Sequence, residues 1–181
     1  MTNKYRWTLA TTGIVGGLIA LTALSTLLLR IPIPATTGYF NIGDVFVIFS
    51  GLWLGPLAGA LVGAIGPSIA DAIGFPVYIP ATFATKGMEG LVVGLIASMG
   101  GQRNIKIKVV AAFCGGVTVV VGYFLFQAFI YPAVGNTIPA FAITDIGAAM
   151  VELVPNMVQG LVGALGGLAL WRAVSGYDRN K

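Results

Sequence analysis

Long apolar stretches alternate along the chain with short segments that contain proline, glycine and polar residues. The first apolar stretch runs from Trp7 to Leu29 and is followed by RIPIPATTGYFN, whose prolines cannot lie in the interior of a helix. At Gly55 and Pro56 a turn signal divides a longer uncharged stretch into two shorter ones. The pattern predicts six helices, at about residues 7–29, 43–54, 56–72, 81–99, 107–131 and 146–173.

The composition assigns these helices to a membrane. Hydrophobic residues make up 57% of the 181 residues, charged residues only 9%, and the mean hydropathy is +0.92, which is far from the averages of soluble domains. Six spans fill the chain, so we expect one integral membrane domain over residues 1–181. Histidine is absent and Cys114 is the single cysteine, so no disulfide, metal site, cofactor or catalytic residue is expected.

Basic residues give the expected orientation, because the cytoplasmic loops of membrane proteins collect them. An even number of spans puts both termini on one side, which carries Lys4, Arg6, Arg103, Lys106, Lys108, Arg172, Arg179 and Lys181. The other side carries Arg30, and Lys86 falls within a span. Both termini are therefore predicted to be cytoplasmic. The net charge of +4 is a topology signal, and no nucleic-acid partner is expected.

Two groups of polar residues lie within the predicted spans, where charges are costly unless they have a partner or face water. Lys86 and Glu89 are three residues apart on the fourth helix, so they share a face and are expected to pair. Glu152, Asn156 and Gln159 have spacings of four and three on the last helix, which also places them on one face. Two polar stripes on different helices favour a shared cavity. The alternative is an interhelical network that only locks the bundle together.

The three longest connections are predicted to be loops on the non-cytoplasmic side, at about residues 30–42, 73–80 and 132–145. Irregular backbone near a membrane persists where it packs against protein or lines a wet cavity, so these loops favour a pocket that opens outward. Ordinary variation in loop length is an equally good explanation on length alone. Asp44, Asp71 and Asp145 lie near helix ends, where a role as a cap is favoured over ligand binding.

Small residues recur four positions apart on two of the predicted helices. On the first helix the pairs are Gly13 with Gly17 and Gly16 with Ala20, which gives a smooth face for a close helix contact. The third helix repeats the spacing at Gly55, Gly59 and Gly63. Such faces usually pack within the same chain. The spaced glycines of GALVGAIG lack the lysine of a nucleotide-binding loop, so any ATP hydrolysis is expected to take place in another protein.

Three stretches of the sequence resemble the substrate-binding S components of energy-coupling factor (ECF) vitamin transporters. They cover residues 38–74, 80–97 and 154–167. The similar features are an N-x-G-D entry to the second helix, a G-P turn after it, the GAIGPSIAD end of the third helix, and P-x-T-x-x-x-K-G-x-x-G in the fourth helix. Together with the six-helix length, the resemblance extends over nearly the whole chain.

The resemblance implies an all-α S-component fold in a bacterial or archaeal cell membrane, with a ligand pocket near the outer surface. It implies a high-affinity substrate-binding subunit of an ABC-type importer rather than an enzyme. Its ligand would be a water-soluble vitamin or vitamin precursor of the pyridoxine, hydroxymethylpyrimidine or riboflavin type. Its partners would be a membrane coupling subunit, against which it topples to deliver the ligand inward, and two cytoplasmic ATPase subunits.

On this interpretation Lys86 lines the pocket, while Glu89 either neutralises it or holds the fourth helix in place. Amides and a carboxylate on the last helix would bind a heteroaromatic ring, and aromatic side chains would stack on it or cover it. The expected substrate-binding residues are Lys86, Glu89, Glu152, Asn156, Gln159, Tyr39, Asn41, Asp44, Tyr78, Thr82, Phe83 and Tyr123. The expected contacts with the coupling subunit are Gly13, Gly16, Gly17 and Ala20, where the alanine signature usual in the family appears in glycine form.

Two functions of other classes remain open from the sequence. A membrane enzyme acting on a lipid or isoprenoid would need an acid and a base or a metal site, but histidine is absent and the carboxylates lack Asp-x-x-Asp spacing. A stand-alone carrier of small molecules would be supported by inverted repeats or a broken helix pair, and no convincing internal repeat is visible.

Overall fold

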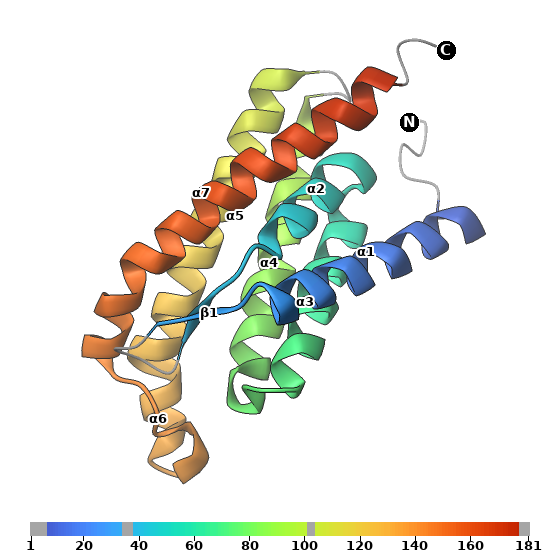
Figure 1. The fold of residues 1–181 in the computed structure, drawn as a ribbon. Coiled ribbons are helices and arrows are strands. Elements are labelled where there is room, and N and C mark those ends of the chain that lie inside the picture. The colour runs from blue at the N-terminus through green and yellow to red at the C-terminus, as the bar shows by residue number, and fades with distance from the viewer. Residues whose placement is uncertain (1–6, 34–37, 101–103, 178–181) are drawn as a thin grey trace.

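The fold of the chain is given by a computed structural model (Figure 1), which describes residues 7–33, 38–100 and 104–177. All six predicted helices are confirmed. They are α1 (Leu9–Leu28), α2 (Asp44–Leu54), α3 (Pro56–Ala72), α4 (Ile79–Met99), α5 (Ile105–Leu125) and α7 (Ile146–Tyr177). The turn between α2 and α3 is made by Gly55, whose φ of 92° is a conformation that favours glycine.

Short regular segments occupy regions that were predicted to be plain loops. Between α1 and α2, strand β1 (Ile31–Pro32) pairs antiparallel with β2 (Tyr39–Phe40) to form a small hairpin. The 3-10 turn η1 (Pro76–Tyr78) leads directly into α4, and the turn η3 (Pro139–Phe141) precedes α7. The loop predictions were wrong at these places because elements of two or three residues are too short to show a hydrophobic period.

The helical chain continues beyond α5, where the sequence predicted a helix end at about 131. A π-helical segment, η2 (Phe126–Ile130), joins α5 to α6 (Tyr131–Gly135) without a break. Pro132 lies in the first turn of α6, where a helix does not need the missing N–H group. The proline therefore does not end the helix, and the predicted boundary was wrong by several residues.

α2 lies at the centre of the bundle and packs against α3, α4 and α7. Its Val47, Ile48 and Leu52 are fully buried in the hydrophobic core. Figure 1 shows α7 running along α5 on one side of the molecule and α1 beside α3 on the other, in agreement with the contacts between these pairs. The core is thus built around a helix too short to cross a membrane alone.

Glycines on α3 allow a close contact with α4, and this pair forms the most extensive helix contact in the fold. A methyl group at Gly59 would lie 2.4 Å from the carbonyl oxygen of Gly90. A methyl group at Gly63 would lie 2.0 Å from the carbonyl oxygen of Lys86. The expectation that the small residues of the third helix pack within the chain is therefore confirmed. The contact of Gly63 with the main chain of Lys86 fixes the position of Lys86 along the bundle axis relative to α3.

The small residues of α1 behave differently from those of α3. A methyl group at Gly13, Gly16 or Gly17 would meet no atom within 4 Å in the part of the chain that the structure describes, and Ala20 is exposed. The general expectation that such faces pack inside the same chain is therefore wrong for α1. Its stripe of small residues is left free for contact with lipid or with another protein.

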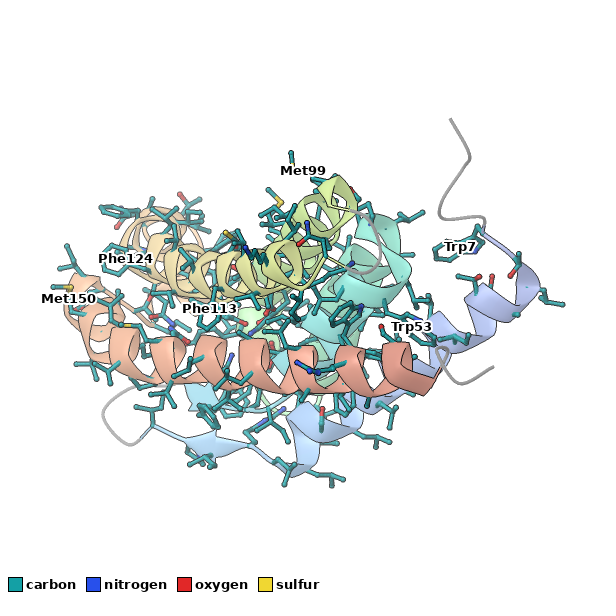
Figure 2. All side chains as sticks on the ribbon, turned by 90° about the horizontal axis from the view of Figure 1, so that it is seen from above. Trp7, Trp53, Met99, Phe113, Phe124 and Met150 are labelled. Carbon is teal, nitrogen blue, oxygen red and sulfur yellow. The ribbon has the colours of Figure 1, made fainter. Side chains whose placement is uncertain are left out.

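Apolar side chains cover much of the exterior. Within the described ranges, four helical segments are long and apolar enough to cross a membrane: Leu9–Leu28, Pro76–Met99, Ile105–Gly135 and Ile146–Ser175. Met99, Phe113 and Met150, which Figure 2 labels, are among many large apolar side chains exposed on the surface. An apolar surface of this extent marks contact with a bilayer, so the chain is a multi-pass membrane protein.

One basic residue that entered the topology prediction lies in the interior. Lys108 is buried, and its Nζ donates a hydrogen bond of 2.8 Å to the carbonyl oxygen of Leu52 near the end of α2. A cation there offsets the partial negative charge of the helix C-terminus, so the role of Lys108 is structural.

The basic residues of the prediction that lie outside the described residues are Lys4, Arg6, Arg103, Arg179 and Lys181. The orientation of the termini stays a prediction.

Candidate functional site

A cavity lies where the hairpin, η1, α4, the α5–η2 junction and α7 meet. Its lining consists of Gly38, Tyr39, Asn41, Tyr78, Thr82, Tyr123, Gln127, Glu152, Asn156 and Gln159. The open space among these side chains, including its solvent-filled mouth, is about 330 Å³. The side chains leave its interior room for little more than a water molecule. The walls carry hydroxyl groups, amides and one carboxylate.

The last helix supplies one wall of this cavity. Glu152, Asn156 and Gln159 all line it, as expected of residues on one helical face. Gln159 is held by the protein at both ends of its amide. Its Oε1 accepts a hydrogen bond of 2.9 Å from the main-chain N–H of Asn41, and its Nε2 donates one of 3.1 Å to Oδ2 of Asp44. Gln159 therefore joins the cavity to the start of α2.

Gln127 lines the cavity and was not predicted from the sequence. It is only 1% exposed, and its Nε2 donates a hydrogen bond of 2.5 Å to Oε2 of Glu152. It lies in η2, and π-helical turns of this kind often occur at functional sites. Thr144 donates a 3.0 Å hydrogen bond to the main-chain oxygen of Gln127. A lone amide in the apolar run FLFQAFI is the signal that would have identified it.

Two acceptor atoms in the cavity have no hydrogen-bond partner among the described residues. They are Oε1 of Glu152 and Oε1 of Gln127, both buried. The hairpin runs directly against the carboxylate, since a methyl group at Gly38 would lie 2.2 Å from Oε1 of Glu152. A bound molecule that offers hydrogen-bond donors would satisfy both acceptors, and buried polar groups without partners are rare in folded proteins.

Tyr39 attaches the hairpin to the end of α3. Its hydroxyl donates a hydrogen bond to the carboxylate of Asp71, so Asp71 has a side-chain partner rather than the expected role as a cap. The guanidinium of Arg30 lies 4.5 Å from the centre of the Tyr39 ring and 4.8 Å from that of Phe75. Arg30 also donates a 2.9 Å hydrogen bond to the carbonyl oxygen of Ala70. Burial and the nearby Asp71 carboxylate raise the pKa of the Tyr39 phenol well above its usual value.

A buried ion pair lies outside the cavity lining and is joined to it by the hydrogen bond between Gln159 and Asp44. The ammonium of Lys86 binds the carboxylate of Asp44 on α2, and Glu89 is farther away, with 3.9 Å between Nζ and Oε2. The first partner of Lys86 therefore comes from another helix. Lys86, Glu89 and Asp44 are buried and do not line the cavity. The cap interpretation of Asp44 was wrong, because Gly43 is the N-cap and no side chain caps α2.

The remaining candidates divide between the cavity and the surface. Thr82 and Tyr123 line the cavity and share a hydrogen bond of 3.0 Å between their hydroxyl groups, and Tyr78 lies beside them in the lining. Phe83 is 53% exposed and is not part of the lining. Asp145 is a helix cap as predicted, since its Oδ1 accepts a 2.8 Å hydrogen bond from the N–H of Ala148.

Comparisons with known proteins agree with this architecture. The sequence matches the family model described as ECF-type riboflavin transporter, S component, over residues 6–175. An uncharacterised protein from Pyrococcus woesei is 33% identical over 147 residues, which are 80% of this chain and 89% of that protein. The fold is similar to a solved structure of the S component of a bacterial ECF transporter, with a TM-score of 0.69, 16% identity, and coverage of 92% of this chain and 95% of the other.

Proposed function

The chain belongs to the family of ECF-type riboflavin transporter S components, and we propose that it captures riboflavin in the cavity between the hairpin, α4 and α7. S components are the substrate-binding proteins of transporters, so this protein is not an enzyme. The enzyme interpretation that the sequence left open is thereby set aside. The family also implies a vitamin ligand and an ECF module as the partner.

The observation that carries the proposal is the combination of groups in the cavity wall. Tyr39, Tyr78 and Tyr123 offer aromatic surface for a flat ring, and Asn156 offers an amide with both a donor and an acceptor. Glu152 adds acceptors for hydroxyl groups. Riboflavin combines a flat heteroaromatic ring with a chain of hydroxyl groups, which is the chemistry that this wall is able to recognise.

The length of the polar stripe supports riboflavin over the smaller ligands considered from the sequence. Glu152 and Gln159 are seven residues apart, which corresponds to about 10 Å along a helix. A single pyridine or pyrimidine ring cannot reach both ends of such a stripe. A three-ring flavin with its hydroxylated chain can reach both, so the whole wall would contribute to binding.

Delivery of the ligand requires a partner, because the sequence contains no nucleotide-binding loop. We expect the loaded protein to topple against a membrane coupling subunit driven by two ATPase subunits. The free stripe of α1 at Gly13, Gly16, Gly17 and Ala20 is the proposed contact surface. It is smooth and unused within the described part of the chain, as a helix that must pack closely against another protein requires.

Titration of the purified protein with riboflavin, followed by quenching of flavin fluorescence, tests the proposal. The native protein should bind one riboflavin tightly. Asn156→Leu should weaken binding at least about tenfold, because a buried ligand group left without a partner costs about 1–3 kcal/mol. Phe83→Ala is the matched control, since Phe83 is large and lies outside the cavity wall. A folded native protein that does not quench riboflavin would refute the proposal.

A further inference from the structure

The cavity has two chemically different ends. Near the start of α2, Gln159 and Asn41 are bonded to each other, and the amide of Asn156 lies next to them along α7. The other end, under the hairpin, is formed by Glu152 and Gln127. We call the first the amide end and the second the acid end. Glu152 and Gln159 lie about 10 Å apart along the helix axis, and Asn156 lies between them along the helix.

The acid end offers a ligand two unpaired acceptors. One N–H of the Gln127 amide donates to Oε2 of Glu152, and the Oε1 atoms of both residues have no partner among the described residues. These atoms belong to side chains that are 1% and 4% exposed, so water does not readily serve them. A ligand that places donors here gains two hydrogen bonds, one of them to a carboxylate.

The two parts of a flavin match the two ends differently. The imide edge of the ring has one donor between two carbonyl acceptors, and the carbonyls would face acceptors if this edge lay at the acid end. Adjacent hydroxyl groups of the ribityl chain can each donate, which satisfies neighbouring acceptors together. An amide such as that of Asn156 complements the imide edge instead.

Cations near the cavity are already engaged. The ammonium of Lys86 binds Asp44. The guanidinium of Arg30 lies against the rings of Tyr39 and Phe75 and donates to the carbonyl oxygen of Ala70. Among the described residues that line the cavity, only Glu152 carries a charge. A phosphate group at the acid end would therefore meet a carboxylate without any compensating cation from the cavity wall.

From this arrangement we infer that the Glu152–Gln127 pair binds the hydroxyl chain of the ligand and favours binding of the neutral flavin over its phosphate ester. The inference rests on the proposed function, since it assigns an orientation to the same ligand in the same cavity. Gln127 acts as a positioning residue that fixes the carboxylate, and Glu152 makes the contact.

Three flavins test the two parts of the inference, which are the contact with the hydroxyl chain and the discrimination against the phosphate ester. Riboflavin carries the hydroxyl chain, lumiflavin has a methyl group in its place, and riboflavin 5′-phosphate adds the charge. Glu152→Ala should weaken the binding of riboflavin about tenfold to a hundredfold, because riboflavin loses a buried hydrogen bond to a charged group. The affinity for lumiflavin, which makes no such bond, should change less than about threefold. Native protein should bind the phosphate ester at least about 30-fold more weakly than riboflavin, since like charges meet.

Glu152→Gln keeps the shape of the side chain and removes its charge, so it should narrow the gap between riboflavin and its phosphate ester. A riboflavin ester with a neutral acyl group at the same hydroxyl controls for size and should bind the native protein better than the phosphate. Equal losses of riboflavin and lumiflavin in Glu152→Ala, or equal native affinities for riboflavin and its phosphate, would overturn the inference while leaving the proposed function intact. Failure of the native protein to bind either unphosphorylated flavin would overturn both.

Discussion

Lys86 is a buried charge inside a membrane protein, and the carboxylate of Asp44 compensates this charge. The pair is fully enclosed, with Asp44 also accepting a hydrogen bond from Gln159. A buried ion pair contributes little net stability, but the loss of one partner leaves an uncompensated charge. The two residues are therefore expected to depend on each other more than on the ligand.

Lys86→Met tests this dependence. It should lower the free energy of unfolding by about 3–5 kcal/mol, because the Asp44 carboxylate loses its counter-ion in the interior. The double variant Lys86→Met with Asp44→Asn should recover part of the loss, since neither residue then carries a charge. Thermal unfolding in detergent measures both effects, and a double variant less stable than Lys86→Met would contradict the pairing.

Tyr39 should keep its proton well into the alkaline range. Burial raises the pKa of its phenol, so its hydrogen bond to Asp71 stabilises the fold below the usual tyrosine pKa of about 10 and is lost only as the pH rises through the higher folded value. At a pH just above 10, native protein and Tyr39→Phe should therefore show equal phenolate absorbance. A weaker phenolate signal in Tyr39→Phe would mean that Tyr39 titrates normally.

Single residues were predictable from the sequence where spacing along one helix decides their position. The stripe of Glu152, Asn156 and Gln159 is such a case, because a helix places these spacings on one face. The partner of Lys86 was not predictable in this way, since Asp44 comes from another helix and no periodicity relates the two. Gln127 was missed because no other charged or amide residue shares its helical face, so its place in an apolar run is the one sequence signal for it.

At the scale of helices, glycine determines how closely α3 and α4 approach. Gly63→Ala should lower the melting temperature, because the added methyl group would lie 2.0 Å from a main-chain oxygen of α4 and overpacking costs about 1–3 kcal/mol. Gly16→Ala on α1 is the matched control. It has open space around it and should leave stability equal or slightly higher, since alanine favours helix more than glycine. Equal destabilisation by both would contradict the contact.

The helices themselves could be predicted because each apolar run is bounded by prolines, glycines or charges. Their exact ends could not, since α4 begins at Ile79 after a 3-10 turn and the fifth helix continues through η2 to Gly135. Proline was taken as a breaker at Pro132, whereas in the first turn of a helix it is accommodated. The hairpin escaped prediction because its two pairs of residues are held by tertiary contacts such as that of Tyr39 with Asp71.

For the whole molecule, binding and transport should be separable. Gly16→Leu on the free face of α1 should leave riboflavin affinity unchanged, because the residue is not part of the cavity lining. It should abolish or strongly reduce association with the coupling subunit and hence uptake, since a bulky side chain prevents close helix packing. Val117→Leu, on the exposed face of α5, is the control. Normal uptake by Gly16→Leu in reconstituted vesicles would rule out α1 as the contact surface.

The narrow interior of the cavity bears on how fast a ligand is able to enter. A flavin does not fit into space for little more than a water molecule, so the walls must move before it is bound. The observed rate of binding in stopped-flow fluorescence should then level off at high riboflavin concentration, at the rate of opening. A rate that rises linearly throughout would show an entrance already open. On this view the protein trades speed of capture for a long residence time, which suits the retrieval of a scarce nutrient.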